Sequence, residues 1–237
     1  MSHELRTPLN AIIGFGQLIA DQRFGLHSEK YSQFARRILT SARHLLELIN
    51  DILDLAKVEA GRIDLRPARV ELPTLIREAR SVVAGLAATK SIQIDIEIGE
   101  GIGEVYVDPG RLKQVLYNYL SNAIKFSGDH EQVLVRAVPE GETAFRIEVV
   151  DHGIGIDSNE YHRVFVEFQQ LDAGFDKRYP GTGLGLPLTK RIVEAQGRTV
   201  GFSSTFGSGS TFYATLPRNA AAATSADVTS RQAAPVG

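Results

Sequence analysis

The feature that most constrains the fold is a heptad pattern of apolar residues between positions 31 and 56. Its members alternate steps of four and three, the spacing that lines up side chains along one helix face and marks a coiled-coil seam. Further leucines flank the seam and widen it. One helical hairpin does not cover so broad a stripe, so we expect two hairpins to pair into a four-helix bundle, which predicts a homodimer. The seam consists of Tyr31, Ala35, Ile38, Ala42, Leu45, Ile49, Ile52 and Ala56, and the flanking leucines are Leu39, Leu46, Leu48, Leu53 and Leu55.

An amphipathic helix is also expected upstream, from about Ser2 to Gln22. At 100° per residue, His3 lies roughly 150° from the centre of its apolar stripe, so we expect the imidazole to face solvent. Glu4 is placed to accept a hydrogen bond from one ring nitrogen, which leaves the other free to act as a nucleophile. Pro8 has no N–H to donate within the helix and should bend it. The stripe consists of Leu5, Leu9, Ile12, Gly16 and Ile19.

An isolated His-Glu pair is usually an ordinary surface feature, but the surrounding string carries more information. The sequence S-H-E-L-R-T-P-L-N-A-I resembles the H-box of sensor histidine kinases. The resemblance implies that His3 is the autophosphorylated histidine and that Thr7 aids dephosphorylation of the regulator by orienting water. His44, in the second helix, is interpreted as a surface residue and not as a second phosphoacceptor.

Composition excludes several other classes. The net charge of −2 gives no electrostatic reason for a nucleic-acid partner, and the absence of cysteine excludes disulfides and thiolate chemistry. No apolar run approaches the ~20 residues of a membrane span, so we expect a cytoplasmic portion, and a membrane anchor elsewhere in the full-length protein stays open. The chain begins two residues before His3. We therefore expect an upstream sensor domain that is missing from this chain; the alternative is a naturally short protein that receives its signal from a partner.

The rest of the chain predicts an α+β protein with three parts. We expect a helical hairpin over residues 1–64, an α/β sandwich over residues 65–218 and a disordered tail or linker over residues 219–237. The resemblance to histidine kinases implies that the hairpin serves dimerisation and histidine phosphotransfer and that the sandwich binds ATP. Within the sandwich, helices are expected from Pro73 to Ala88, from Pro109 to Phe126 and from Leu186 to Gln196. Short, mostly antiparallel strands are expected at about 70–72, 92–98, 104–107, 132–138, 144–150, 199–204 and 211–216.

Three polar positions follow one another along the helix that begins at Pro109. Asn118, Asn122 and Lys125 share a stripe beside the apolar face. Amide oxygens suit Mg²⁺, and a lysine one turn on can balance phosphate charge, although a solvated helix face is at least as common. The stretch 118–126 resembles the N-box of histidine kinases, with Tyr119 where leucine is usual. The resemblance implies that Asn122 is the Mg²⁺ ligand, that Asn118 assists at the metal and phosphates, and that Lys125 meets phosphate.

A carboxylate followed by two glycines comes directly after the strand that ends at Val150. Asp151, Gly153 and Gly155 form a D-x-G-x-G string, in which an acid accepts from an exocyclic amine and glycines let the backbone approach a flat ring. The same string also occurs in plain turns. It resembles the G1 box of the family, which assigns Asp151 to the amino group of adenine.

A glycine-rich stretch leading into a helix supplies the phosphate site. Free N–H groups and the positive end of the helix dipole face the residues before Leu186, a natural place for phosphate. The stretch resembles the G2 box, and it implies that ATP is bound by Gly181, Thr182, Gly183, Leu184 and Gly185. Upstream, Phe165 and Phe168 resemble the F-box. Residues 171–180 are interpreted as a lid in which Lys177 or Arg178 touches phosphate; a solvated loop is the alternative.

The resemblance runs from Ser2 to about Arg218 and implies an ATP- and Mg²⁺-dependent protein histidine kinase of a two-component system. Phosphoryl transfer of this kind depends mainly on positioning and charge neutralisation. The resemblance implies that the group passes from His3 to an aspartate of a response regulator. Two alternatives stay open: an ATP-binding dimeric scaffold without kinase activity, and another ATPase of the gyrase or chaperone kind. The H-box argues against the second, because such ATPases do not contain it.

Overall fold

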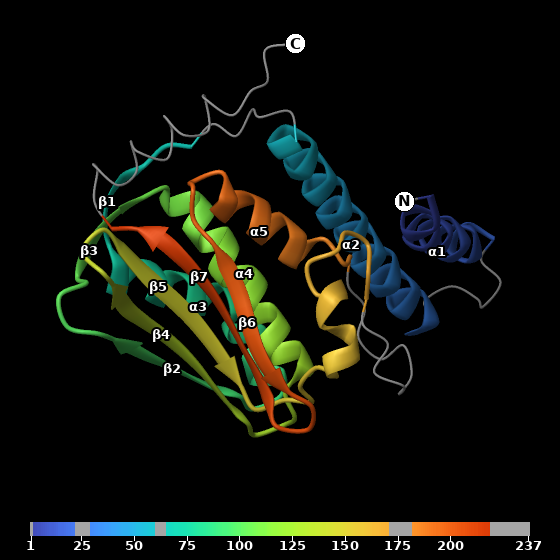
Figure 1. Cartoon of the computed structure of the whole chain (residues 1–237). Helices are drawn as coiled ribbons and strands as arrows, with labels where there is room; N and C mark the ends of the chain where they lie inside the picture. Colours follow the sequence, from blue (N-terminus) through green and yellow to red (C-terminus); the bar gives the residue numbers. More distant parts are fainter. Residues whose placement is uncertain (1, 22–28, 60–64, 171–181, 219–237) are drawn as a thin grey trace, which may run out of the picture. The chain divides into compact units, whose positions relative to one another are not determined.

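The computed structural model describes residues 2–21, 29–59, 65–170 and 182–218. The chain divides into two compact units, Met1–Lys57 and Val58–Gly237, which are described separately (Figure 1). The expected tail after Arg218 and the whole of the expected lid lie outside the described residues.

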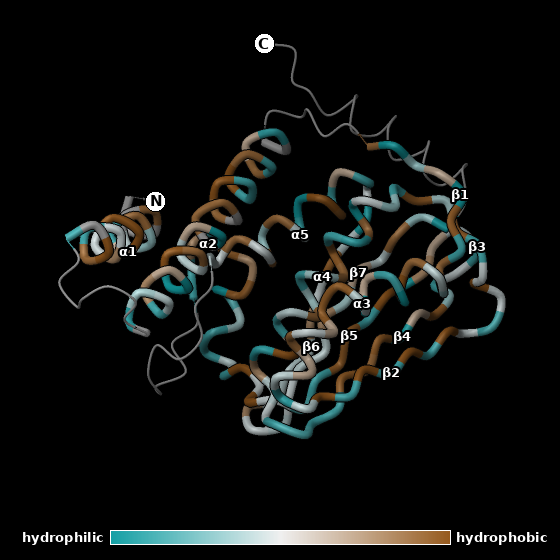
Figure 2. The backbone as a smooth tube through the Cα atoms, turned by 180° about the vertical axis from the view of Figure 1, so that it is seen from behind, coloured by the Kyte–Doolittle hydropathy of each residue, from teal (hydrophilic) through white to brown (hydrophobic). Residues whose placement is uncertain are grey.

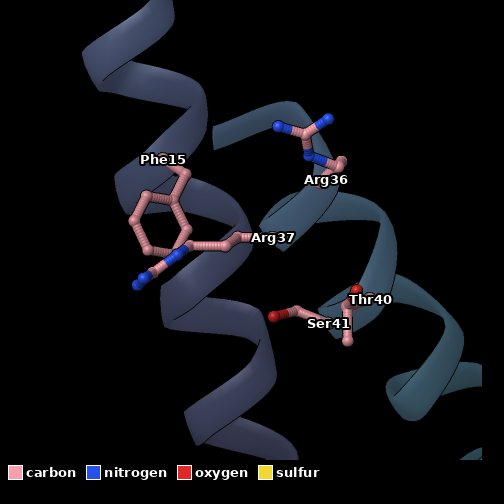
Figure 3. A pocket seen from close by; sticks show the side chains of 5 residues that line it. All are labelled: Phe15, Arg36, Arg37, Thr40 and Ser41. Carbon is pink, nitrogen blue, oxygen red and sulfur yellow. The ribbon is translucent and has the colours of Figure 1, made fainter. Parts of the chain in front are cut away.

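The described residues of the first unit form two helices, α1 (Ser2–Ala20) and α2 (Glu29–Glu59). Both were expected, with α1 ending slightly before Gln22. The rings of Phe15 and Phe34 stack with their centroids 5.5 Å apart, which joins the two helices. The Arg37 guanidinium lies 5.4 Å from the centre of the Phe15 ring, in a small pocket between the helices (Figure 3). Pro8 lies inside α1, as the sequence requires.

The apolar stripe of α2 is only partly buried, although Leu48 and Leu55 beside the seam are buried. Alternate hydrophobic and hydrophilic segments run along this helix in Figure 2. Tyr31, Ile38, Leu45 and Ile52, from the expected seam, are half-buried. The expected burial of the α1 stripe is also incomplete, because Leu9 is 45% exposed. A second row at heptad spacing on α2 is exposed throughout: Leu39, Ala42, Leu46, Ile49, Leu53 and Ala56.

In the part of the second unit that the structure describes, short strands are combined with three longer helices. The helices are α3 (Leu72–Thr89), α4 (Pro109–Phe126) and α5 (Gly185–Glu194). A short 3₁₀ helix, η1 (Ser158–Arg163), was not predicted. The strands are β1 (Ala68–Glu71), β2 (Gln93–Ile98), β3 (Glu104–Val107), β4 (Gln132–Glu140), β5 (Ala144–Asp151), β6 (Val200–Thr205) and β7 (Gly209–Pro217).

Five of these strands form one sheet in the order β2-β4-β5-β7-β6. The β2–β4 pair is parallel and the other pairs of this sheet are antiparallel, in agreement with the expectation of mostly antiparallel strands. β1 and β3 form a separate antiparallel pair. The register places Asp151 opposite Val133 on one side and Ser210 on the other, so the end of β5 is flanked by both neighbouring strands.

Helices α3, α4 and α5 cover one face of the sheet (Figure 1). Alternate residues of the central strands, such as Val135 and Ile147, are fully buried against them. The opposite face carries charged residues in a cross-strand network. Arg136 contacts Glu97 and Glu148, and Arg146 contacts Glu148 and, at 2.5 Å, Glu140. The predicted mixed fold, a helical region followed by an α/β sandwich, is confirmed. Among the described residues, no helix combines the length and apolar character needed to cross a membrane.

Candidate nucleotide-binding site

Helix α4 carries the first group of candidate residues, and its start is set by the sequence Asp108-Pro109. The Asp108 carboxylate accepts a hydrogen bond of 3.0 Å from the Arg111 N–H, and Pro109 occupies the first turn, where its missing N–H costs nothing. The apolar face of α4 is buried, as predicted, from Leu112 to Ile124. The stripe of Asn118, Asn122 and Lys125 beside it is half-buried.

Asn118 joins α4 to the beginning of α5. Its Nδ2 donates to the Gly185 carbonyl oxygen and to the Thr189 hydroxyl, both at 3.0 Å. Thr189 is completely buried and was not predicted as a site residue. Because both contacts use the nitrogen of the amide, the oxygen Oδ1 keeps its capacity to accept a hydrogen bond or to bind a cation. The N-box and the G2 box are therefore held together by direct hydrogen bonds.

Asn122 and Lys125 lie further along α4. The Asn122 side chain makes no hydrogen bond to the described part of the chain, so its amide oxygen is available as a ligand. Burial lowers the pKa of Lys125, whose ammonium lies 4.8 Å from the centre of the Phe126 ring. A lysine that is partly removed from water interacts more strongly with an arriving phosphate.

Asp151 ends β5 with its carboxylate almost fully buried, 5% exposed. Oδ1 accepts hydrogen bonds from the Gly153 N–H at 2.9 Å and from the Ser210 N–H at 3.3 Å. Burial raises the pKa of Asp151, and these two N–H groups act in the opposite direction. Oδ2 has no donor among the described residues, so it can accept one hydrogen bond from a buried ligand.

The glycines after Asp151 are required by close packing. A Cβ at Gly153 would overlap the Phe126 carbonyl oxygen, so this loop lies directly against the end of α4. The Ile154 N–H donates to that same oxygen at 3.3 Å. Gly155 has φ +65°, and a Cβ there would overlap the Thr205 carbonyl oxygen. The G1 box therefore has a fixed position between α4 and the β6–β7 turn.

The described part of the G2 box is a turn that opens α5. Gly183 has φ +68°, and its carbonyl oxygen accepts from the Phe168 N–H at 3.2 Å. The Thr182 hydroxyl accepts from the Leu184 N–H at 3.1 Å. α5 begins at Gly185, so its free N–H groups lie next to Asn118. Gly181, Lys177 and Arg178 lie outside the described residues.

The predicted phosphoacceptor residues lie in the first unit. His3, Glu4 and Thr7 occupy the beginning of α1. Thr7 is exposed, whereas the side chains of His3 and Glu4 lie outside the described part of the structure. The predicted surface position of His44 also concerns a side chain that is not described.

Two further residues support the site, and neither was predicted from the sequence as a site residue. Thr189 orients Asn118, and its spacing of four from Gly185 is the only sequence signal for it. Tyr119, the departure from the family leucine, is buried and donates from its hydroxyl to the Tyr213 carbonyl oxygen at 3.0 Å. That hydrogen bond fastens α4 to β7 and explains how the tyrosine is accommodated.

Together these groups match the chemistry of a nucleotide with a bound hard cation. A buried carboxylate oxygen suits an exocyclic amine, the start of α5 suits phosphate, and amide oxygens of α4 suit Mg²⁺. No cluster of three or more acidic, histidine or cysteine side chains occurs within the described ranges. A cation at this site would therefore depend on amide oxygens and on the phosphates themselves.

Comparisons with known proteins agree with this geometry. Residues 1–61 match the model of the His Kinase A (phospho-acceptor) domain, and residues 107–220 match the histidine kinase-, DNA gyrase B- and HSP90-like ATPase. The chain is 41% identical over 219 residues to the circadian input-output histidine kinase CikA of Synechococcus elongatus, covering 92% of this chain and 29% of CikA. It is 43% identical over 219 residues to the virulence sensor protein BvgS of Bordetella bronchiseptica, covering 89% and 17%.

A solved structure gives the same assignment. The chain resembles full-length ShkA, crystallised in complex with AMPPNP, with a TM-score of 0.72 and 32% identity, over 92% of this chain and 45% of ShkA. The chain spans less than a third of the length of CikA and BvgS. With a phospho-acceptor domain followed by an ATPase domain, it belongs to the sensor histidine kinases and comprises the catalytic core of that family.

Proposed function

We propose that this chain is an ATP-dependent protein histidine kinase that phosphorylates His3 and passes the phosphoryl group to an aspartate of a response regulator. Residues 1–64 would serve as the dimerisation and phosphotransfer domain, and residues 65–218 as the ATP-binding domain. The observation that carries the proposal is the Asn118 amide, which holds the phosphate-binding start of α5 against the N-box helix.

The residues divide into three roles. Asp151 would accept a hydrogen bond from the adenine amino group through Oδ2, the carboxylate oxygen that the backbone leaves available. Asn122 would hold Mg²⁺ with help from Asn118 Oδ1, and Lys125 would neutralise phosphate charge. Bound Mg²⁺ supplies charge neutralisation at the phosphates. The glycines of the G2 box and the Thr182 turn would give the phosphates backbone N–H groups.

At the acceptor, Glu4 would hold one ring nitrogen of His3 and stabilise the positive charge that develops on the imidazole. The other nitrogen attacks the γ-phosphorus, and ADP leaves. Thr7, four residues after His3, would orient water when the regulator is dephosphorylated. Its exposure on α1 is compatible with that role.

The exposed heptad row on α2 supports the dimer. Leu39, Leu46, Ile49 and Leu53 are each between 41% and 59% exposed, which is an unusual concentration of bulky apolar side chains on one helix face. We propose that a second copy covers this row. Sedimentation of the wild type should give a dimer and Leu46→Glu a monomer, whereas Arg43→Glu on the polar side should stay dimeric; a monomeric wild type would contradict the dimer.

The kinase activity is tested by incubation with γ-labelled ATP and Mg²⁺. We expect label that survives alkali and is lost in acid, as a phosphohistidine requires. His3→Gln and Asn122→Ala should both abolish it, whereas His162→Gln, which changes an exposed histidine of η1, should retain it. A longer chain, extended upstream of Ser2, is run in parallel, so that a weakened dimer is not mistaken for inactivity. Nucleotide binding without label in both the shorter and the longer chain would instead support the dimeric scaffold.

A further inference from the structure

The C-terminal end of α4 lies under the loop that follows Asp151, and its carbonyl oxygens are unusually well satisfied. A helix leaves its last four carbonyls without partners in the helix itself. Here the Ala123 oxygen accepts from the Ser127 N–H at 3.0 Å and from the Ser127 hydroxyl at 2.7 Å. The Phe126 oxygen accepts from the Ile154 N–H at 3.3 Å, which is the contact that seats the G1 box.

The remaining carbonyls are all bound by a single side chain. The Lys90 ammonium donates to the carbonyl oxygens of Ile124 at 3.0 Å, Lys125 at 2.8 Å and Ser127 at 2.9 Å. These three contacts use all three N–H groups of the ammonium, and they place a positive charge at the negative end of the helix dipole. The acceptors lie on both sides of Phe126, so Lys90 holds the backbone that presents the Phe126 oxygen.

The Lys90 backbone is itself held from both sides. Its N–H donates to the Ala87 oxygen at 3.1 Å, at the end of α3, and its carbonyl oxygen accepts from the His130 N–H at 2.8 Å. The next residue, Ser91, has φ +55°, a left-handed conformation that turns the chain sharply into β2. Lys90 therefore connects the end of α3 to the end of α4 through a rigid turn and one charged side chain.

We infer that Lys90 is a positioning residue for the adenine end of the nucleotide site. It fixes the end of α4, and through the Phe126 oxygen it fixes the Gly153–Gly155 loop against which the base would lie. The inference rests on the proposed nucleotide-binding role of Asp151. Lys90 touches neither nucleotide nor metal in this scheme; it acts on the loop geometry alone.

A purely stabilising role and a positioning role of Lys90 lead to different expected results when its ammonium is removed. Loss of a purely structural cap would lower stability throughout the domain. Loss of a positioning cap should loosen the G1 box locally, weaken nucleotide binding and leave the chemical step nearly intact once the site is saturated. The distinction can be measured because the affected loop and the reacting phosphate lie at different parts of the site.

The experiment compares Lys90→Met with the wild type in the full chain. Methionine keeps the length and removes the charge and the donors. We expect the Kd for ADP with Mg²⁺, measured by titration calorimetry, to rise about tenfold, because a loosened loop weakens the contacts to the base without removing any of them. The autophosphorylation rate at saturating ATP should stay within about twofold of the wild type. Hydrogen exchange should accelerate in residues 152–156 and not in the centre of β4 and β5.

Lys113→Met is the matched control, because Lys113 lies on the exposed side of α4, the helix whose end Lys90 binds, and pairs with Glu78 at 2.5 Å. It should change neither the Kd nor the exchange of the loop. Should Lys90→Met fail to fold, Lys90→Gln carries the same test, since its amide restores at most two of the three hydrogen bonds. Unchanged ADP affinity and unchanged loop exchange in a folded variant would overturn the role of Lys90. A wild type that binds no ADP would instead overturn the proposed nucleotide site.

Discussion

Replacing Asp151 by asparagine tests the adenine pocket most directly, because the structure determines how the new amide must lie. Oδ1 of Asp151 receives two backbone N–H groups, from Gly153 at 2.9 Å and from Ser210 at 3.3 Å. Only an oxygen can occupy that position. In Asp151→Asn the amide oxygen therefore takes the place of Oδ1, and the NH₂ group takes the place of Oδ2, where the adenine amino group would donate.

The magnitude follows from that exchange. The wild type offers adenine a charge-assisted hydrogen bond in a buried site, whereas the variant opposes one donor with another. The loss of such a bond is worth about 2–3 kcal/mol, which corresponds to a decrease in affinity of about 30- to 150-fold. A base with a 6-oxo group has the opposite pattern and can accept from the new NH₂. The preference for adenine over hypoxanthine should therefore shrink or reverse.

The assay is a calorimetric titration of ADP and IDP into the wild type, Asp151→Asn and Asp129→Asn. Asp129 lies in an exposed turn, so the same change there serves as a control for the altered charge. The wild type should prefer ADP, Asp129→Asn should behave like it, and Asp151→Asn should lose the preference. An unchanged ratio of the two affinities in Asp151→Asn would refute the assignment of Oδ2 to the base.

Three further outcomes are expected. Burial raises the pKa of Asp151, so its carboxyl stabilises the fold most below its unfolded pKa of about 4 and loses that contribution as the pH rises. In calorimetry at neutral pH, unliganded Asp151→Asn should therefore have a higher melting temperature than the wild type. The difference between the two melting temperatures should shrink as the pH is lowered. Gly155 and Gly141 share a left-handed φ (+65° and +67°), but of these two only Gly155 would place a Cβ against a neighbouring carbonyl oxygen. In urea unfolding, Gly141→Ala should therefore cost ~1 kcal/mol, and Gly155→Ala should destabilise the domain by more than twice that amount. Thr189→Val keeps the buried shape and removes one acceptor of the Asn118 amide, so the labelling rate should fall about fivefold, whereas Thr189→Ser should retain it; equal rates in both would contradict the orienting role.

Much of the fold was predictable because local signals and packing agree. Ile92, Ile94, Ile96 and Ile98 alternate with polar residues, which accounts for the strand expected at 92–98 and found as β2. The helix expected from Pro109 begins at that residue, after the Asp108 cap. The parallel pairing of β2 with β4 was not predictable, because it joins segments that are separated by β3 and α4. The η1 helix was missed since its six residues carry no hydrophobic period and rely on the Asp157 cap, which accepts from the Asn159 N–H.

The site shows the same division between local and distant information. The string around Asp151 and the stripe of Asn118, Asn122 and Lys125 are contiguous or periodic, so chemistry and spacing identify them. Lys90 could not be found in this way, since its three acceptors lie 34 to 37 residues further along the chain. In the sequence it is one of several surface lysines.

The charged face of the sheet has a consequence for how such a kinase would work. A sheet covered by helices on one face would ordinarily pack a second layer of structure against its other face. Here Arg136 and Arg146 form ion pairs across neighbouring strands; their partners are Glu97, Glu140 and Glu148. Such exposed ion pairs stay hydrated at little cost in free energy. The solvent-facing side of the sheet would thus not bind other protein surfaces tightly, so the ATP-binding domain could approach a histidine, transfer its phosphoryl group and dissociate. Permanent association would depend on the leucine row of α2.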